Sequence, residues 1–318
     1  MDISSVCILG GSGFVGEAIA DELAGVGGAD LRVRVITRSR PRAMKLTVLP
    51  TVELVVADPH DTASLARCFE DMDAVINLVG ILHESGRETF QRCHVELPQK
   101  VVEACHSAGV QQLLHMSALG ASESGPSKYQ RSKAAGEQAI RRAADGLPVT
   151  IFRPSVIFGE GDAFLNTFAS LVRIFPVIPL AGARTRFQPI WVEDVARCFA
   201  GALGNPAAFG RAYEICGPKQ YTLEELVRFV SKTLGRRRGI VPLGGALATL
   251  QATALEFLPG KMMTRDNLAS MSVDNICSQP FPAIFGFEPA SMEAVVPEYL
   301  APTLARARYP RFRHDAGR

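Results

Sequence analysis

The stretch Val6-Cys7-Ile8-Leu9-Gly10-Gly11-Ser12-Gly13-Phe14-Val15-Gly16 decides the fold of this chain. An apolar run typical of a β-strand leads directly into glycines at positions 10, 13 and 16. The run that follows places Val15, Ile19 and Leu23 at helical spacing. This order of strand, glycine turn and helix predicts the first half of a βαβ unit that binds a dinucleotide.

The three spaced glycines have separate tasks in such a turn. Gly10 allows the tight turn, Gly13 lets the backbone approach a pyrophosphate, and Gly16 lets the helix pack closely on the strand. The pyrophosphate is then expected at the N-terminus of the helix, where backbone N–H groups are free and the helix dipole is positive. An ordinary turn is the alternative, but the flanking strand and helix favour cofactor binding.

The composition is that of a soluble globular protein. Of its 318 residues 47% are hydrophobic and 21% are charged, and the net charge of +2 gives no reason to expect a nucleic-acid partner. The seven cysteines form no C-x-x-C pair, which favours free thiols over a disulfide framework or a metal site. A first strand at about residue 5 leaves no room for a signal peptide, so we expect a cytoplasmic protein.

Apolar runs and helical segments alternate along the next 150 residues. Strands are predicted at 33–36, 52–58, 74–80, 112–117 and 147–154, with helices at 62–71 and 89–108 between them. This alternation predicts an α/β fold, a Rossmann doubly wound parallel sheet with a smaller C-terminal substrate lobe. The predicted domains are 1–158, joined by 188–216, and a capping lobe over 159–318.

The end of the second strand bears on the type of cofactor. An NAD site places Asp or Glu there to bond the ribose 2′-hydroxyl, but this chain has Thr37, 21 residues after Gly16, and then Arg38. A guanidinium pairs well with a 2′-phosphate, so Arg38 favours NADP(H) over NAD(H), with Arg40 or Arg42 as further candidates. The alternative is a solvated basic loop.

A possible catalytic pair follows the fifth strand. Tyr129 and Lys133 are four residues apart, so they share one face of a helix. A nearby lysine is expected to lower the pKa of the phenol, which can then exchange a proton with a carbonyl or an alcohol. Ser117 is expected close to the pair, at the end of the strand.

These motifs together resemble the extended short-chain dehydrogenase/reductase superfamily over about residues 5 to 235. The glycine turn, Asp58, the segment 77–80, the Tyr-x-x-x-Lys pair and the segments 153–154 and 188–194 occur in the order typical of that superfamily. The glycine turn, residues 115–121 and residues 129–137 look most like an atypical branch. This branch contains the nucleotide-binding accessory subunit of respiratory complex I (alpha subcomplex, subunit nine) and its bacterial relatives.

The resemblance implies a tightly held NADP(H) and a set of site residues. The cofactor-binding set is Gly10, Ser12, Gly13, Phe14, Val15, Gly16, Thr37, Arg38, Asp58, Val79, Gly80, Lys133 and Pro154, and the catalytic set is Tyr129, Lys133 and Ser117.

Two positions depart from the pattern of the enzymes in this superfamily. The catalytic Ser or Thr that usually follows the fifth strand is replaced by Ala118 and Leu119. The Asn of a common Asn-Val pair looks replaced by His94. These changes argue against ordinary dehydrogenase turnover, because the hydroxyl orients the substrate oxygen.

Three functions therefore stay open. The first is a reductase, epimerase or dehydratase that acts on a nucleotide-sugar or another carbonyl compound. It would use Tyr129 and Lys133, with Arg153 and Gln188 in its pocket. The second is a protein that holds NADP(H) in a structural or quinone-linked role, and the third is a redox sensor with a protein partner. The helix 246–258 carries Leu247, Leu250, Ala254, Phe257 and Leu258 on one side. This side is expected in the core of the lobe; the alternatives are contact with an apolar quinone-like substrate, a membrane surface or a respiratory complex.

Overall fold

The computed structural model describes residues 2–26, 30–257 and 263–301, and it divides into two compact units. Unit 1 comprises residues 1–154, 192–215 and 277–287, and unit 2 comprises 155–191, 216–276 and 288–318. The return of the chain to unit 1 at 192–215 lies within the predicted segment 188–216. A second return, at 277–287, has no sequence pattern that predicts it.

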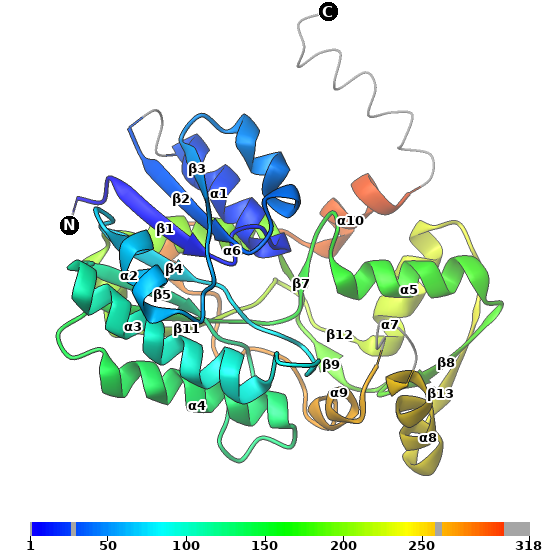
Figure 1. Cartoon of the computed structure of the whole chain (residues 1–318). Coiled ribbons are helices and arrows are strands. Elements are labelled where there is room, and N and C mark those ends of the chain that lie inside the picture. The colour runs from blue at the N-terminus through cyan, green and yellow to red at the C-terminus, as the bar shows by residue number, and fades with distance from the viewer. Residues whose placement is uncertain (1, 27–29, 258–262, 302–318) are drawn as a thin grey trace, which may run out of the picture. The chain divides into compact units, whose positions relative to one another are not determined.

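Unit 1 is built on one parallel sheet of seven strands in the described part of the chain (Figure 1). The strands are β1 Ser5–Leu9, β2 Arg32–Thr37, β3 Val52–Val56, β4 Ala74–Asn77, β5 Gln112–Met116, β6 Val149–Pro154 and β11 Ala212–Ile215. Their order across the sheet is β11-β6-β5-β4-β1-β2-β3, and each neighbouring pair is parallel. The order reverses direction between β1 and β4, and the carboxyl ends of these strands form the crevice where such sheets bind ligands.

Helices cover both faces of this sheet, which confirms the predicted doubly wound fold. The helices of unit 1 are α1 Phe14–Val26, α2 Thr62–Phe69, α3 Leu97–Ala108, α4 Lys128–Ala143 and α6 Val192–Ala202. Helix α1 packs against α6 on one face, and α3 lies between α2 and α4 on the other. Shorter turns complete the unit: the 3₁₀ helices η1 Arg40–Val48, η3 Pro206–Ala208 and η4 Ala283–Phe285, and the π-helix η2 Gln91–Glu96.

The core of unit 1 follows from the apolar spacing of these elements. Leu65 and Phe69 of α2 pack with Val101 and Cys105 of α3, all buried against the strands. The predicted helix 89–108 is a π-helix followed by α3, which ends at Gly109 in the left-handed region (φ +70°). Such a glycine lets the chain leave the helix without the steric conflict of a Cβ atom.

Unit 2 has its own core. Its helices are α5 Ala163–Ile174, α7 Leu223–Thr233, α8 Gly245–Glu256, α9 Arg265–Ser270 and α10 Met292–Leu300. Its strands pair two by two: β7 Ile157–Phe158 with β10 Ile190–Trp191, β9 Arg186–Phe187 with β12 Tyr221–Thr222, and β8 Val177–Ala181 with β13 Gly239–Leu243. Thr222 caps α7 as predicted, because its Oγ1 accepts from the N–H of Glu225 at 3.2 Å and the Glu225 carboxylate accepts from the N–H of Thr222 at 2.7 Å.

Helix α8 differs from the sequence prediction. We expected the side that carries Leu247, Leu250 and Phe257 to be lobe core, but these side chains are 60%, 66% and 83% exposed. The helix instead buries the small residues Ala248 and Ala252. Because short side chains allow close approach, the alanine side of α8 packs against its neighbours. The large apolar side chains therefore face outward. Leu258 lies outside the described residues.

The cysteines also differ from the prediction. Cys7, Cys68, Cys93, Cys105 and Cys198 are free and buried, as expected of thiols that pack as small apolar side chains. Cys216 and Cys277, however, are disulfide-bonded. Neither cysteine belongs to a C-x-x-C pair, so no spacing in the sequence marks them for a disulfide.

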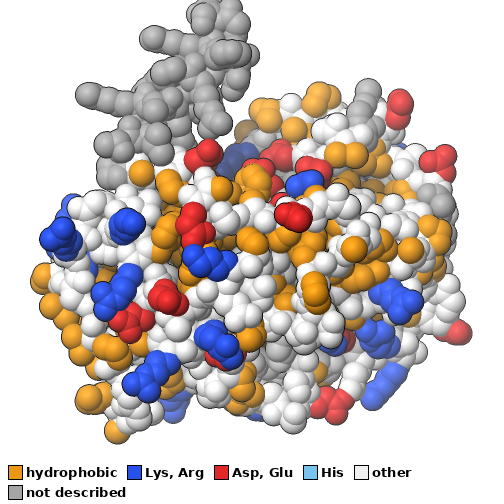
Figure 2. Space-filling model, turned by 180° about the vertical axis from the view of Figure 1, so that it is seen from behind, with side chains coloured by type: hydrophobic (Ala, Val, Ile, Leu, Met, Phe, Trp, Pro, Cys, Tyr) orange, Lys and Arg blue, Asp and Glu red, His pale blue; other side chains and the backbone are white. Residues whose placement is uncertain are grey.

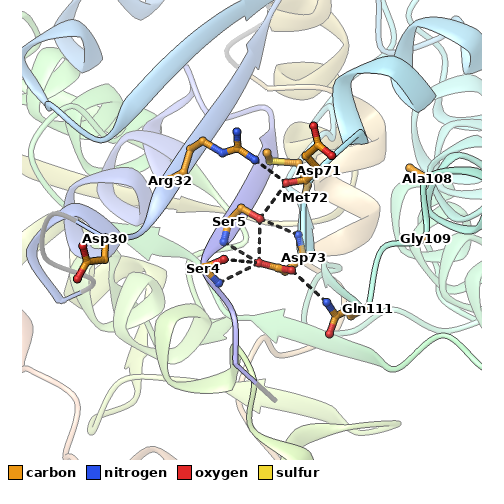
Figure 3. Close-up of a pocket in the computed structure, with 10 residues that line it drawn as sticks. All are labelled: Ser4, Ser5, Asp30, Arg32, Asp71, Met72, Asp73, Ala108, Gly109 and Gln111. Atoms are coloured by element: carbon orange, nitrogen blue, oxygen red, sulfur yellow. Dashed lines mark hydrogen bonds between the residues drawn. The ribbon is translucent and has the colours of Figure 1, made fainter.

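A hollow at the amino ends of β1 and β4 is structural (Figure 3). The Oδ2 atom of Asp73 accepts hydrogen bonds from the N–H and the hydroxyl of both Ser4 and Ser5, at 2.8–2.9 Å. Gln111 Nε2 donates to the other carboxylate oxygen at 3.0 Å. These bonds lower the pKa of Asp73 although partial burial raises it. This carboxylate therefore joins the two strands at the edge opposite to the ligand crevice.

Candidate functional site

The glycine turn has the geometry that its sequence predicts. It follows β1, and the N–H of Gly13 donates to the carbonyl of Gly10 at 3.0 Å. Gly10 has φ +79°, and a Cβ atom there would lie 3.3 Å from the backbone of Leu78. At Gly16 a Cβ atom would lie 2.4 Å from the Cα of Gly11, so no side chain fits. Gly10 and Gly16 are thus required by the fold, whereas a Cβ at Gly13 would meet only the Gly10 carbonyl, at 3.2 Å.

Ser12 belongs to the same turn and links it to the next strand. The hydroxyl of Thr37, at the end of β2, donates to the Ser12 Oγ at 3.2 Å or to the carbonyl of Ser39 at 3.1 Å. Phe14 and Val15 open α1 directly after the turn. The predicted residues from Gly10 to Gly16 and Thr37 are therefore neighbours at one edge of the sheet.

The end of β4 is held in shape by a buried amide. Asn77 Oδ1 accepts from the N–H of Val79 at 3.1 Å, and its Nδ2 lies 3.2 Å from Nδ1 of His115. Burial lowers the pKa of His115 to about 3, with a further contribution from Lys133, so the ring is neutral and accepts from the amide. This arrangement fixes Val79 and Gly80 where they leave β4, next to the turn after β1.

Lys133 lies against this segment. The capping box of Ser127 and Gln130 begins α4, and Lys133, in the second turn of that helix, is buried. Its Nζ donates to the carbonyl of Met116 at 3.3 Å, and a Cβ atom at Gly80 would lie 3.0 Å from it. Burial lowers the pKa of Lys133 to about 8, although Glu137 raises it. The ammonium group thus approaches a backbone that only glycine leaves open.

Tyr129 shares the lysine face of α4, but its acidity differs from the prediction. The ring is half-buried and packs edge-on against His94, with ring centroids 5.6 Å apart. Burial raises the pKa of Tyr129 to about 12, so the expected lowering by Lys133 is wrong for this structure. The phenol keeps its proton at neutral pH and is suited to donate it.

His94 connects α4 with the segment after β4, and its bonds define its tautomer. The Nε2 atom accepts from the N–H of Ile81 at 3.0 Å, so Nδ1 carries the proton and donates to Ser132 Oγ at 2.8 Å. Ser132 in turn donates to the carbonyl of Tyr129 at 2.7 Å. Burial lowers the pKa of His94 to about 2, and Lys133 adds to this effect. A neutral histidine therefore positions the helix of the Tyr129–Lys133 pair.

Ser117 follows β5 but makes no catalytic contact in this structure. Its N–H donates to the carbonyl of Phe152 at 2.7 Å, while its buried Oγ has no hydrogen-bond partner among the described residues. A buried hydroxyl without a partner is unfavourable and indicates a group that a bound ligand can satisfy. Among the described residues the Ser117 hydroxyl makes no hydrogen bond to Tyr129, so its predicted catalytic role stays a prediction.

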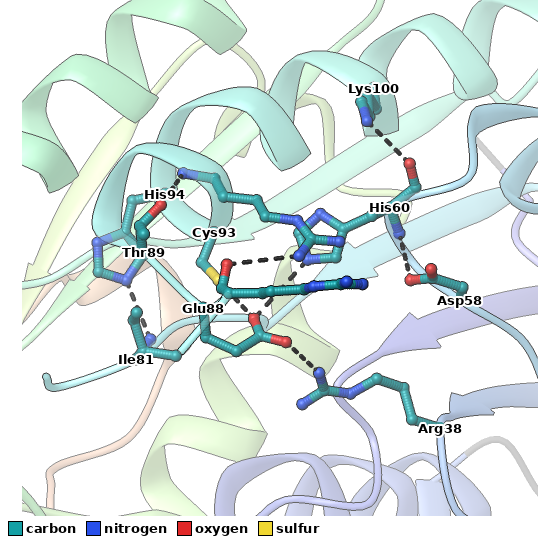
Figure 4. A network of polar contacts seen from close by, with 11 residues as sticks. Arg38, Asp58, His60, Ile81, Glu88, Thr89, Cys93, His94 and Lys100 are labelled. Carbon is teal, nitrogen blue, oxygen red and sulfur yellow. Dashed lines mark hydrogen bonds and ion pairs between the residues drawn. The ribbon is translucent and has the colours of Figure 1, made fainter. Parts of the chain in front are cut away.

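The end of β2 carries a network that the sequence did not predict (Figure 4). Arg38 Nη1 lies 2.5 Å from Glu88 Oε1, and the Cys93 thiol donates to Glu88 Oε2 at 2.9 Å. His60 Nε2 is 3.8 Å from the same oxygen. Asp58 accepts from the N–H of His60 at 2.9 Å and so belongs to the same region. Arg40 and Arg42 lie on the exposed start of η1.

This network is close enough to bind a metal ion, but its charges argue against one. Donor atoms of His60, Glu88 and Cys93 lie within 4.8 Å of one another. Both oxygens of Glu88 are already engaged, one by the Arg38 guanidinium and the other by the thiol. Burial lowers the pKa of His60, and the nearby Arg92 lowers it further. A cation would have to approach two guanidinium groups, so we assign no metal here.

Two residues predicted for a substrate pocket are engaged elsewhere. Arg153 on β6 makes a two-pronged ion pair with the buried Glu137 of α4, at 2.8 and 2.5 Å. Gln188 Nε2 donates to the carbonyl of Gly217 at 2.7 Å within unit 2. Pro154 ends β6 and is buried, and its carbonyl accepts from the N–H of Leu119.

The residues of unit 1 fit a dinucleotide cofactor. Gly13 leaves the backbone open beside the first turn of α1, Gly80 does the same beside Lys133, and Ser117 holds an unsatisfied hydroxyl. All three follow neighbouring strands, at the crevice between β1, β4 and β5. Glu88, His60 and Cys93 are residues that the sequence reasoning missed. His60 and Glu88 lie in turns without periodicity, and Cys93 is a buried residue of η2, where its position indicates only core.

Comparison with known proteins agrees with this geometry. The chain is 31% identical to the mitochondrial NADH dehydrogenase [ubiquinone] 1 alpha subcomplex subunit 9 of Arabidopsis thaliana, over 80% of this chain and 64% of that protein. It is 30% identical to a ceramide reductase of Caulobacter vibrioides, over 75% of this chain and 73% of that protein. The chain thus spans about two thirds to three quarters of the length of these relatives. The fold also matches that of triphenylmethane reductase from Citrobacter sp. complexed with NADP(H), with a TM-score of 0.76 and 17% identity, over 93% of this chain and 100% of that one.

The match to a protein family covers the turn, the Tyr-x-x-x-Lys pair and all seven strands of the sheet. It extends over residues 6–216, about two thirds of the chain. The resemblance inferred from the motifs is therefore confirmed, and the chain belongs to the NAD dependent epimerase/dehydratase family.

Proposed function

We propose that this protein holds NADP(H) and uses it mainly in a structural, quinone-linked or redox-sensing role, with weak oxidoreductase activity. The observation that carries the proposal is the open backbone at Gly13 and Gly80, with the Lys133 ammonium only 3.0 Å from the position of a Gly80 Cβ. Gly10 to Gly16 would hold the pyrophosphate, Lys133 the nicotinamide ribose, and Arg38 the 2′-phosphate.

The weak activity is inferred from the groups around Tyr129. When bound, the nicotinamide supplies hydride transfer, and the protein must supply the proton and orient the substrate oxygen. Tyr129 can donate the proton from its phenol oxygen. Ala118 and Leu119 stand where enzymes of the resembling superfamily usually carry a Ser or Thr, and they offer no hydroxyl to orient that oxygen. Arg153 is already paired with Glu137, so it is a poor ligand for a substrate phosphate.

Two measurements test this proposal. The first identifies the small molecule released when the purified protein is denatured; NADPH or NADP⁺ supports it, and a sugar nucleotide favours an enzyme acting on that compound. The second follows NADPH oxidation with quinones, ketones and nucleotide-sugars in wild type and Tyr129→Phe. One positioned acid contributes about 10²–10⁴-fold to a rate. Rapid turnover that the phenylalanine variant loses would establish an NADP-dependent reductase or epimerase that uses Tyr129 and Lys133.

Cofactor choice is tested by Arg38→Glu. A charge-assisted hydrogen bond contributes about 1.5–3 kcal/mol, or roughly one to two powers of ten in affinity. Wild type is expected to bind NADPH more tightly than NADH, and Arg38→Glu should narrow or reverse this preference. If Arg38→Glu leaves the ratio of the NADPH and NADH affinities unchanged, the assignment of Arg38 to the 2′-phosphate is wrong.

Peripheral attachment to a membrane is a second proposal, and it rests on α8. Among the described residues no helix is long and apolar enough to cross a membrane. Leu247, Leu250 and Phe257 nevertheless expose an apolar stripe, and Arg236 and Arg237 are exposed before β13, which leads into α8. Figure 2 shows hydrophobic and basic side chains close together on the surface of the molecule. Such a combination suits anionic lipid. Co-flotation with anionic vesicles should be lost in Leu250→Glu and kept in Val26→Glu, which changes an exposed apolar residue of α1.

A further inference from the structure

The basic residue at the end of β2 is already paired in this structure. Arg38 has a 59% exposed side chain, yet its guanidinium lies 2.5 Å from Glu88 Oε1. Glu88 comes from the segment after β4, 50 residues further along the chain. Figure 4 shows the Glu88 carboxylate between Arg38 on one side and the group of His60 and Cys93 on the other. A ligand that needs Arg38 must therefore share it with a carboxylate.

Glu88 is fixed by contacts on its other side. Its backbone N–H and C=O exchange two hydrogen bonds with Ser85, both 3.0 Å long. The buried Cys93 thiol donates to its Oε2 at 2.9 Å. The hydrogen bonds from Cys93 and Arg38 lower the pKa of Glu88 below its usual range, so the carboxylate is charged at neutral pH. The Arg38–Glu88 pair is thus held in place by more than the mutual attraction of two exposed side chains.

This carboxylate lies where parallel-sheet dinucleotide sites distinguish the two cofactors. Sites for NAD supply an acid at the end of β2 for the ribose hydroxyls, and sites for NADP supply an arginine for the 2′-phosphate. In this protein β2 ends at Thr37 and Arg38 follows it, while Glu88 brings an acid to the same arginine from the segment after β4. The site therefore combines both recognition elements.

We propose that Glu88 limits the preference for NADP(H) by competing with the 2′-phosphate for Arg38. This inference rests on the proposed function, because it requires a dinucleotide at this edge of the sheet. A 2′-phosphate carries about two negative charges at neutral pH, so it must displace Glu88 or accept its repulsion. A 2′-hydroxyl carries no charge and can donate to the carboxylate. Wild type should therefore prefer NADPH over NADH less strongly than a protein with Arg38 but without the Glu88 charge.

The test measures dissociation constants for NADPH and NADH on the full-length protein and three variants. Glu88→Gln removes the charge, and Glu88→Asp keeps it on a shorter side chain. Glu53→Gln is the matched control, because Glu53 also pairs with an arginine, Arg34, at 3.0 Å on the neighbouring strands β3 and β2. We expect Glu88→Gln to raise the NADPH-to-NADH selectivity by about tenfold or more. Glu88→Asp should stay near wild type, and Glu53→Gln should not change the ratio.

The possible results separate the two proposals. If Glu88→Gln weakens both cofactors equally, Glu88 only supports the fold of its segment and the inference is overturned. An unchanged ratio overturns it as well. If wild type binds neither nucleotide, the proposed function fails instead. Should Glu88→Gln fold poorly, Glu88→Ser in the presence of added acetate gives the same readout, because acetate should then weaken NADPH binding relative to NADH binding.

Discussion

Replacing Lys133 by methionine should make the cofactor-free protein more stable at neutral pH. Burial lowers the pKa of Lys133 from 10.5 to about 8, so the folded protein resists the charge that the unfolded chain carries freely. The difference corresponds to roughly 3 kcal/mol at pH 7. Methionine has a similar length and no charge, but it loses the bond to the Met116 carbonyl, which is worth about 1 kcal/mol. The net expected gain is about 2 kcal/mol.

The sign of the pH dependence makes this prediction specific. Below about pH 8 the lysine is protonated in both states, and the full cost of burying its charge is present. Between about pH 8 and 10.5 the unfolded chain binds more protons than the folded one, so the stability of wild type rises with pH. The advantage of Lys133→Met should therefore shrink across this window and vanish above it.

Urea unfolding of cofactor-free protein at pH 7 and at pH 9.5 checks this prediction. Lys100→Met is the control, because Lys100 also donates to a backbone carbonyl, that of His60, at 2.8 Å, but from the half-buried side of α3. The Lys100→Met protein should be slightly less stable than wild type at both pH values, because it loses this hydrogen bond. A Lys133→Met protein less stable than wild type at pH 7 would refute the reasoning. Lys133→Met should also bind cofactor more weakly, and this would explain why a destabilising lysine is present.

Three further changes have distinct expected outcomes. Gly13→Val should fold, because its Cβ meets only the Gly10 carbonyl at 3.2 Å, but it should abolish cofactor binding in a nicotinamide fluorescence titration; near-normal affinity would contradict the site. Asp73→Ala should lose about 2 kcal/mol in urea unfolding at pH 7. Because the pKa of Asp73 is lowered in the folded protein, this loss of stability should decrease as the pH falls below about 4. A loss that does not depend on pH would contradict a stabilising role of the charged carboxylate. Arg153→Met should destabilise the protein by about 3 kcal/mol by leaving Glu137 buried without its partner, and Glu137→Gln in the same background should restore part of the loss measured by thermal unfolding.

The sequence was sufficient to predict the architecture of unit 1 and the glycine turn after its first strand. Strand-forming runs, helix periodicity and the spacing of Gly10, Gly13 and Gly16 are local properties, and they fix which segments form strands and where the chain turns. Because carboxyl ends of parallel strands meet at one edge, residues after β1, β2, β4 and β5 were expected to be neighbours, and they are. The pair Tyr129 and Lys133 followed from helical spacing alone.

Only the tertiary structure decided the charges and the exposure of particular side chains. Glu88 meets Arg38, and Arg153 meets Glu137, through folding that brings distant segments together, so no local pattern marks either pair. The raised pKa of Tyr129 depends on how much neighbouring atoms exclude water, which spacing along a helix does not report. The apolar stripe of α8 is visible in the sequence, but periodicity cannot tell which side of a helix packs. There the small residues Ala248 and Ala252 pack, because they allow close approach, and the large ones remain outside.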